Sequence, residues 1–169
     1  MRYLIKKGKH NRLSIPSIHF GIKRLKFRFK FDSSCLYSIN DTDDYDLNKL
    51  YGWSMGMHHN DSLRIGWRPD EREANRIQIH TYMYNKKKRN MNFISRVDVD
   101  KWYEMDIEIL LCNKVAFTLS DETGRYIAKV VEENFVIPKF TSGYFLDFFM
   151  GGDKPARQDT IAWIERIKI

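Results

Sequence analysis

The residues best suited to acid–base chemistry lie in one short stretch, Glu104-Met-Asp106-Ile-Glu108. This spacing places the three carboxylates on one face of a β-strand, because successive side chains of a strand point to opposite sides. Such carboxylates can act as nucleophile, general acid or general base. The apolar residues between and around them would form the buried face of the same strand: Tyr103, Met105, Ile107, Ile109 and Leu111. Residues 101–111 therefore predict a central strand with one buried and one acidic face.

The same spacing argues against a working catalytic pair. On a strand, the Cα atoms of Glu104 and Glu108 lie about 13 Å apart, whereas the carboxyl groups of a retaining glycosidase lie about 5 Å apart. The two side chains would have to converge along a curved sheet. Alternating acids also occur on strands that face solvent. We therefore predict that the chain is not an enzyme; if it were one, Glu104, Asp106 and Glu108 would be the catalytic candidates.

Positive charge is concentrated at the start of the chain. The formal net charge is +7, and residues 1–31 contain ten Lys or Arg and no Asp or Glu. Such an excess indicates an anionic partner or a face that only keeps the protein soluble. No nucleic-acid-binding motif accompanies it, and no apolar run is long enough for a membrane span. The predicted partner-binding residues are Lys6, Lys7, Lys9, Arg12, Arg24, Lys26, Arg28 and Lys30.

The elements that must position these residues are strands. Residues 24–31 alternate strictly between cations and large apolar side chains, which is the clearest strand pattern in the chain. Some ten such segments follow one another, including 141–150, and no helix-length period interrupts them. We expect one all-β domain, an antiparallel jelly-roll β-sandwich over residues 21–169, preceded by a basic N-terminal arm over residues 1–20.

No metal or cofactor is predicted. His58 and His59 are adjacent in a turn and have no second cluster at ligand spacing. The acidic loop 40–48 lacks the Gly and the closing Glu of a calcium loop. Cys35 and Cys112 could pair, but two cysteines in a chain of this length favour reduced, half-buried thiols.

Two further groups of side chains could bind a ligand. Tyr82, Tyr84 and Trp102 could serve as platforms on which sugar rings stack, or could belong to the core. The basic tip 86–89 could seek phosphate groups, or could serve solubility alone.

Two passages resemble known sandwiches. Residues 99–130, with Trp102-Tyr103 opening a strand and a turn at Asn113-Lys114, resemble the middle of concanavalin-like and laminin-G-like jelly rolls. The ending from Phe149-Met-Gly-Gly152 to Ile169 resembles their last two strands. This resemblance implies the fold and leaves the activity open. The acidic stretch is also similar to the Glu-x-Asp-x-Glu signature of β-glucanases, which implies Glu104 as nucleophile, Asp106 as its helper and Glu108 as acid/base.

In general style the chain resembles virion proteins of tailed phages, including the crAss-like phages of Bacteroides. The resemblance implies a non-enzymatic auxiliary protein that decorates a capsid through its basic segment. The expected partners are then capsid or other virion proteins, with self-association or a surface glycan as further options. The expected location is the virion, assembled in the host cytoplasm, or otherwise the cytoplasm. A lectin-like carbohydrate-binding module is the alternative, followed by the glycoside hydrolase.

Overall fold

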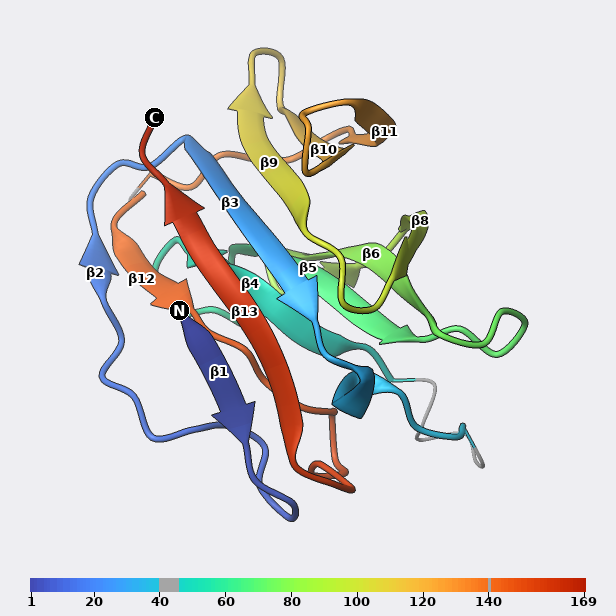
Figure 1. Cartoon of the computed structure of the whole chain (residues 1–169). Helices are drawn as coiled ribbons and strands as arrows, with labels where there is room; N and C mark the ends of the chain where they lie inside the picture. The colour runs from blue at the N-terminus through green and yellow to red at the C-terminus, as the bar shows by residue number, and fades with distance from the viewer. Residues whose placement is uncertain (40–45, 140) are drawn as a thin grey trace.

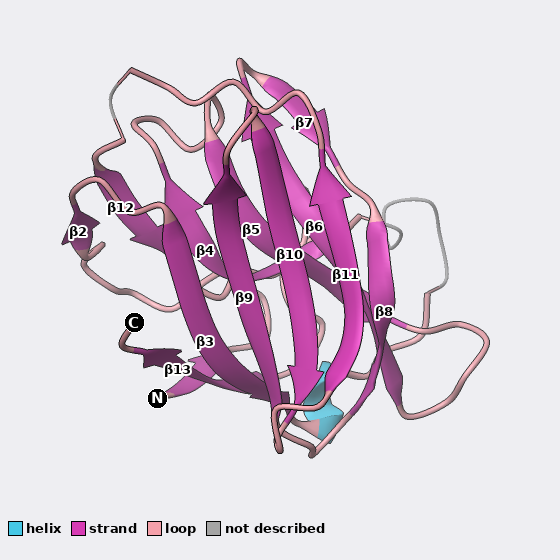
Figure 2. Cartoon of the chain, turned by 90° about the horizontal axis from the view of Figure 1, so that it is seen from above, coloured by secondary structure: helices cyan, strands magenta, loops and turns pink. Residues whose placement is uncertain are grey.

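The fold consists of two antiparallel sheets packed face to face (Figures 1 and 2). The computed structural model describes residues 1–39, 46–139 and 141–169. The six-stranded sheet runs in the order β1 (Arg2–Ile5), β13 (Thr160–Ile167), β3 (Arg24–Phe31), β9 (Tyr103–Leu110), β10 (Lys114–Asp121) and β11 (Tyr126–Glu132). The predicted all-β sandwich is confirmed.

The second sheet has seven strands, and several of them line a groove on its outer face. Its order is β2 (Ile18–His19), β12 (Gly143–Leu146), β4 (Asn48–Ser54), β5 (Ser62–Pro69), β6 (Arg76–Asn85) and β7 (Lys88–Asn90), and β8 (Phe93–Asp98) also pairs with β6. A single 3₁₀ turn, η1 (Ser33–Cys35), follows β3, where the Asp32 side chain accepts a hydrogen bond from the Ser34 backbone N–H.

Alternating burial confirms the two clearest strand predictions. Strand β3 buries its four apolar residues and turns its four cations outward, and β9 buries every second residue from Tyr103 to Ile109. Leu111 was predicted on the buried face and is 89% exposed. It lies beyond the end of β9, in the turn before β10, where the alternation no longer applies.

The predicted strand over residues 141–150 is shorter than expected. Only Gly143–Leu146 pairs as a strand, and Phe149 rejoins the sheet through an isolated bridge to Lys49. Between them the backbone carbonyl of Asp147 accepts a hydrogen bond from the Arg64 guanidinium, at 2.8 Å. A side chain thus takes the carbonyl that a neighbouring strand would otherwise use, and the ladder is interrupted.

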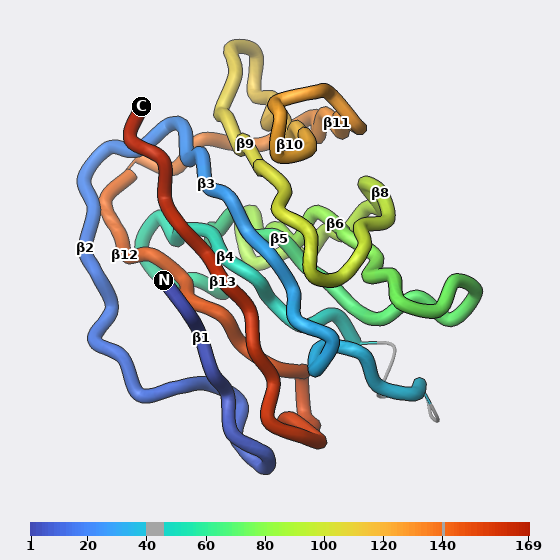
Figure 3. Tube along the Cα trace, in the orientation of Figure 1, coloured from blue at the N-terminus to red at the C-terminus, as the bar shows by residue number. Residues whose placement is uncertain are grey.

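Both ends of the predicted N-terminal arm belong to the sheets. Strand β1 pairs with β13, so the first and last strands lie side by side (Figure 3). Tyr3 and Ile5 are buried in the core. Residues 6–17 then run along the edge of the molecule to β2, which pairs with β12.

Aromatic rings form much of the contact between the two sheets. Phe31 of β3 packs on Trp67 of β5, with ring centroids 5.0 Å apart, and Phe27 packs on Tyr51 of β4 at 5.2 Å. All four rings are buried. Because the inner faces are filled in this way, any ligand surface has to lie on the outer faces or at the ends of the strands.

Both cysteines are unpaired, as predicted, but neither is half-buried: Cys35 is fully buried and Cys112 is exposed. The loose calcium-loop pattern falls on residues 40–45, outside the described residues. Among the residues that are described, no three His, Cys, Asp or Glu side chains gather as a metal site. The described part of the chain also holds no helix long and apolar enough to cross a membrane.

Candidate functional site

A large groove lies on the outer face of the seven-stranded sheet, with a volume of about 690 Å³. Strands β4, β5, β6, β7 and β12 form its floor and sides, and residues 11–16, here called the rim segment, form part of its wall. Four cations, three carboxylates and a group of aromatic and histidine rings line it: Arg12, Lys49, Arg64, Arg89, Asp46, Asp147, Asp153, His58, His59, Tyr82, Tyr84 and Tyr144.

Two buried cations mark the centre of the groove. Lys49 of β4 is 7% exposed and Arg64 of β5 is 8% exposed. The Lys49 ammonium donates to the Gly151 carbonyl at 2.7 Å and lies 5.0 Å from the centre of the Tyr82 ring. Burial and the nearby Arg64 charge lower the pKa of Lys49 to about 8. The site therefore keeps a cation in surroundings that disfavour its charge.

Arg64 is only partly satisfied. One terminal nitrogen donates to the Asp147 backbone carbonyl, while its buried Nε has no hydrogen-bond partner in the described part of the chain. Burial lowers the pKa of Arg64 to about 10. Within the described residues, neither Arg64 nor Lys49 has a carboxylate oxygen within ion-pair distance. Buried charges are normally paired, so an anionic group from outside the chain would complete this site.

A glycine provides the space that the Arg64 strand needs. Gly52 of β4 lies directly opposite Arg64 in the sheet register. A Cβ atom at position 52 would come within 2.0 Å of the Leu63 carbonyl oxygen and 2.6 Å of the Arg64 Cα. The sequence signal for this close approach was the glycine within the strand.

Rings form one side of the groove. Tyr82 and Tyr84 follow one another on the outer face of β6, with centroids 6.0 Å apart, and His59 meets Tyr84 edge-on at 5.4 Å. Arg89 of β7 lies opposite Tyr84 in the register. A hydrogen bond to the Tyr82 side chain raises the pKa of Arg89, so the Arg89 guanidinium stays protonated. Aromatic faces next to cations and carboxylates are the usual lining of sugar sites.

A histidine and a tyrosine form a hydrogen-bonded pair in the same groove. His58 Nδ1 lies 2.7 Å from the Tyr144 hydroxyl, although the two residues are 86 positions apart in the chain. Burial, followed by the charges of His59 and Arg64, lowers the pKa of His58. The lowered pKa favours the neutral imidazole, which can take a proton, and the hydrogen-bonded phenol can give one.

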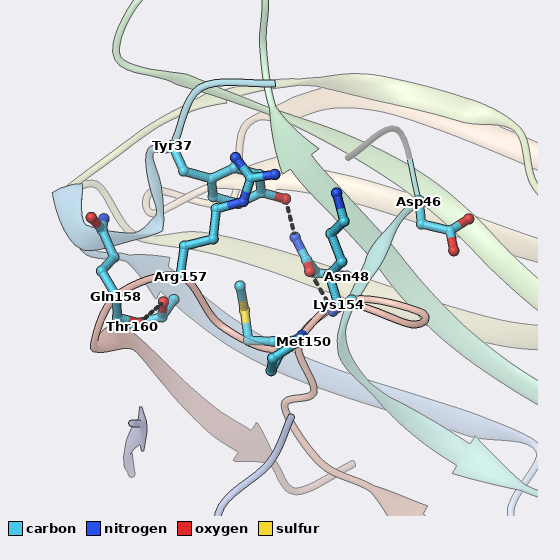
Figure 4. A pocket seen from close by; sticks show the side chains of 10 residues that line it. Tyr37, Asp46, Asn48, Met150, Lys154, Arg157, Gln158 and Thr160 are labelled. Atoms are coloured by element: carbon cyan, nitrogen blue, oxygen red, sulfur yellow. Dashed lines mark hydrogen bonds between the residues drawn. The ribbon is translucent and has the colours of Figure 1, made fainter. Parts of the chain in front are cut away.

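A second, much smaller cavity lies between Asn48 and the loop before β13 (Figure 4). Asn48 holds its walls together, since it donates to the Tyr37 hydroxyl at 2.7 Å and accepts from the Gly151 backbone N–H at 2.6 Å. Its volume is about 20 Å³. This suffices for about one water molecule and excludes an organic ligand.

The carboxylates singled out from the sequence lie on the other sheet. Glu104 and Asp106 of β9 form ion pairs with Lys26 and Arg24 of β3, each with a shortest N–O distance of 2.6 Å. Glu108 lies opposite Arg24 in the register. The acidic row and the cationic row thus face each other across adjacent strands and compensate each other's charge.

The predicted partner-binding cations divide into three groups. Lys6 and Arg28 also form ion pairs, with Asp159 and Glu165, and Lys30 lies over the Trp163 ring at 4.3 Å. Lys7 and Lys9 are exposed in the loop after β1. Arg12 is the one member of the predicted set that lines the groove.

Of the predicted stacking residues, Tyr82 and Tyr84 lie in the groove, whereas Trp102 lies beside Arg28 at the six-stranded sheet. The sequence interpretation did not single out Lys49, Arg64 or Tyr144, and it treated His58 and His59 as turn residues. It included Arg89 in the basic tip 86–89, and of that tip only Arg89 lines the groove. The available signal was that Arg64 alternates with buried apolar residues and so must face outward.

No family model and no curated protein sequence matches the chain. Solved structures do match. A mutant of alginate lyase Aly36B in complex with an alginate trisaccharide is 12% identical, with a TM-score of 0.59, over 99% of this chain and 81% of that one. The binding domain of botulinum neurotoxin serotype G is 12% identical, with a TM-score of 0.52, over 98% of this chain and 38% of that one.

A third match is the CBM2 module of the evolved Dit of Lactobacillus casei BL23 phage J-1, 11% identical with a TM-score of 0.50. It spans 97% of this chain and 74% of that one. At these identities the matches show the fold, a β-sandwich of jelly-roll type, and leave the activity open.

Proposed function

We propose that the groove binds an acidic polysaccharide, with the anionic group of a uronate or a similar sugar on Lys49 and Arg64. The observation that carries this proposal is the pair of buried cations, neither of which has a carboxylate partner among the described residues. A ligand carboxylate would give the Arg64 Nε its missing acceptor and would offset the desolvation of both charges. A neutral sugar would do neither.

The rings beside the cations support a sugar rather than a simple anion. Tyr84 and His59 present half-buried and exposed faces next to Arg89, and an extended groove of about 690 Å³ has room for several sugar units. Alginate, the ligand named in one of the structural matches, is itself a polyuronate. The match supports the proposal only through the shared fold.

Binding assays with alginate, polygalacturonate and the neutral polymer dextran would test the proposal. We expect the two polyuronates to bind, with an affinity that falls as salt is added, and dextran not to bind. Arg89 is exposed in the groove, and Arg89→Ala should weaken binding about tenfold, which corresponds to the free energy of one hydrogen bond to a charged group. Lys88→Ala is the matched control, since Lys88 is a neighbouring exposed cation that does not line the groove. Equal binding of dextran and alginate would refute the proposal.

The His58–Tyr144 pair favours a second candidate function, β-elimination of a bound polyuronate. With the carboxylate neutralised by Arg64 and Lys49, the C–H next to it becomes acidic enough for a base to remove its proton. The electron pair forms a C=C bond as the bond from the neighbouring carbon to the glycosidic oxygen breaks. The acid partner then protonates that oxygen, so no water or cofactor is consumed.

Elimination has a direct signature, because its product carries a new double bond conjugated to the carboxylate and absorbs ultraviolet light. We expect wild-type protein to produce this absorbance from alginate or polygalacturonate, and Tyr144→Phe to bind the polymer without producing it. If wild-type protein binds the polymer and no double bond forms, the groove belongs to a non-enzymatic binding module.

Docking onto a capsid through the basic N-terminal segment stays a prediction. Five of the eight cations expected to mediate it have a carboxylate partner within the chain. Of the other three, Lys30 is half-buried over the Trp163 ring, so a docking surface would rely mainly on the exposed Lys7 and Lys9. Co-purification with particles of the native source would support that role.

A further inference from the structure

The rim segment is attached to the sandwich mainly at its ends. The carbonyls of His10 and Ser17 accept hydrogen bonds from the backbone N–H groups of Met150 and Phe145, at 2.7 and 2.9 Å. Between these anchors, residues 11–16 form no backbone–backbone hydrogen bond within the described chain. The side chains of Leu13 and Ile15 are fully exposed, so they add no apolar burial. Segments with so few contacts open at low free energy.

One carboxylate holds the middle of the rim segment. Asp147 accepts a hydrogen bond from the Ser14 hydroxyl at 3.1 Å and another from the Tyr3 hydroxyl at 3.2 Å. Arg12 reaches the same carboxylate only at 3.8 Å, beyond hydrogen-bond range. Asp147 therefore contacts two guanidinium groups, that of Arg12 through its carboxylate and that of Arg64 through its backbone carbonyl, and its charge opposes that of an incoming anion.

The guanidinium group of Arg12 has one unused hydrogen-bond donor, its Nε–H, among the described residues. Its guanidinium carbon lies 4.1 Å from the centre of the Tyr3 ring, and one terminal nitrogen contacts the Met1 sulfur at 3.2 Å. Its Nε is buried and has no hydrogen-bond partner among residues 1–39, 46–139 and 141–169, and the same is true of the Arg64 Nε. Two guanidinium groups with the same unmet donor thus line one groove, and both contact Asp147.

We propose that Arg12 is a further anion-binding residue, which the rim segment brings to the ligand and which exchanges its loose contact with Asp147 for the ligand's charged group. This inference rests on the proposed function, because the ligand is the acidic polysaccharide bound at Lys49 and Arg64. Binding then ties down the middle of the rim segment, and Asp147 competes with the ligand for Arg12.

A double-mutant cycle separates direct binding by Arg12 from an effect through Asp147. With alginate oligomers as the probe, Arg12→Ala should weaken binding about fivefold, while Lys9→Ala, an exposed cation outside the groove, should leave it unchanged. Asp147→Asn should strengthen binding, because it removes the competing charge, while its one remaining oxygen can still accept from either Ser14 or Tyr3, which donate to different carboxylate oxygens in the wild-type protein. In the Asp147→Asn background, Arg12→Ala should weaken binding by a larger factor than in wild-type protein, because Asp147 no longer competes with the ligand for Arg12.

Hydrogen exchange of the backbone amides at residues 12–15 gives an independent readout. We expect alginate oligomers to slow exchange there in wild-type protein and not in Arg12→Ala. Wild-type affinity in Arg12→Ala, or loss of its effect once Asp147 is replaced, would overturn the assignment of Arg12 and leave the proposed function standing. Failure of wild-type protein to bind any polyuronate would instead overturn both.

Discussion

Raising the pH from 7 to 9 should weaken the binding of an acidic glycan about tenfold through Lys49 alone. The pKa of Lys49 in the free protein is lowered to about 8, whereas an ordinary lysine titrates near 10.5. If the ligand binds only the charged form, the apparent dissociation constant scales with 1 + 10^(pH − pKa). This factor rises about tenfold between pH 7 and pH 9.

The same titration should stabilise the free protein. The folded-state pKa lies below the unfolded one, so the folded chain binds fewer protons between pH 8 and pH 10.5, and the contribution of Lys49 to stability rises with pH. From pH 7 to pH 9 this contribution amounts to about 1.4 kcal/mol. Binding and stability therefore change in opposite directions over one pH interval.

Calorimetric titration with alginate oligomers and urea unfolding, both at pH 7, 8 and 9, would measure the two trends. Lys49→Met removes the charge while keeping a similar shape, so it should bind weakly at every pH and lose the rise in stability. His58 titrates below this interval and Arg64 above it, since their pKa values are lowered from 6.5 and to about 10. An affinity in wild-type protein that does not change between pH 7 and pH 9 would refute the placement of the anion on Lys49.

Three other outcomes are expected. Tyr84→Ala should weaken polyuronate binding several-fold and Trp102→Ala should not, since only Tyr84 lines the groove; equal losses in a binding assay would contradict this. Glu132→Gln should lower the free energy of unfolding by about 2 kcal/mol, measured in urea. The buried carboxylate of Glu132 accepts hydrogen bonds from the side chains of Thr81, Asn90 and Asn92. In the folded protein a thiol reagent should modify Cys112 rapidly, while Cys35 should react only on unfolding; equal rates would contradict the structure.

The strands could be predicted because their signal is local. Residues 24–31 alternate every second position, and one face of a sandwich must be apolar, so β3 and its buried side follow from the sequence alone. The same reasoning fails where a tertiary contact interrupts a strand. Arg64 takes the Asp147 carbonyl, and no local pattern around position 147 shows this.

The groove could be predicted only in part. Tyr82 and Tyr84 were suggested as sugar platforms because they share one face of a strand. Whether that face is hollowed depends on β4, β7 and β12, which come from distant parts of the chain. Lys49 is harder still to predict, because a β-bulge between it and Gly52 shifts the alternation of β4.

The pairing of β3 with β9 also constrains how the chain is made. During translation the basic strand β3 is synthesised about 80 residues before its acidic partner β9. Strand β1 can pair only after β13 has been synthesised. Such distant pairings fold slowly. Until β9 is synthesised, β3 has neither of its sheet neighbours, since β13 follows later still, and its four like charges repel a second nascent chain. The cations of β3 thus have two roles. During synthesis their repulsion opposes aggregation, and in the folded protein Arg24 and Lys26 form ion pairs with the carboxylates of β9.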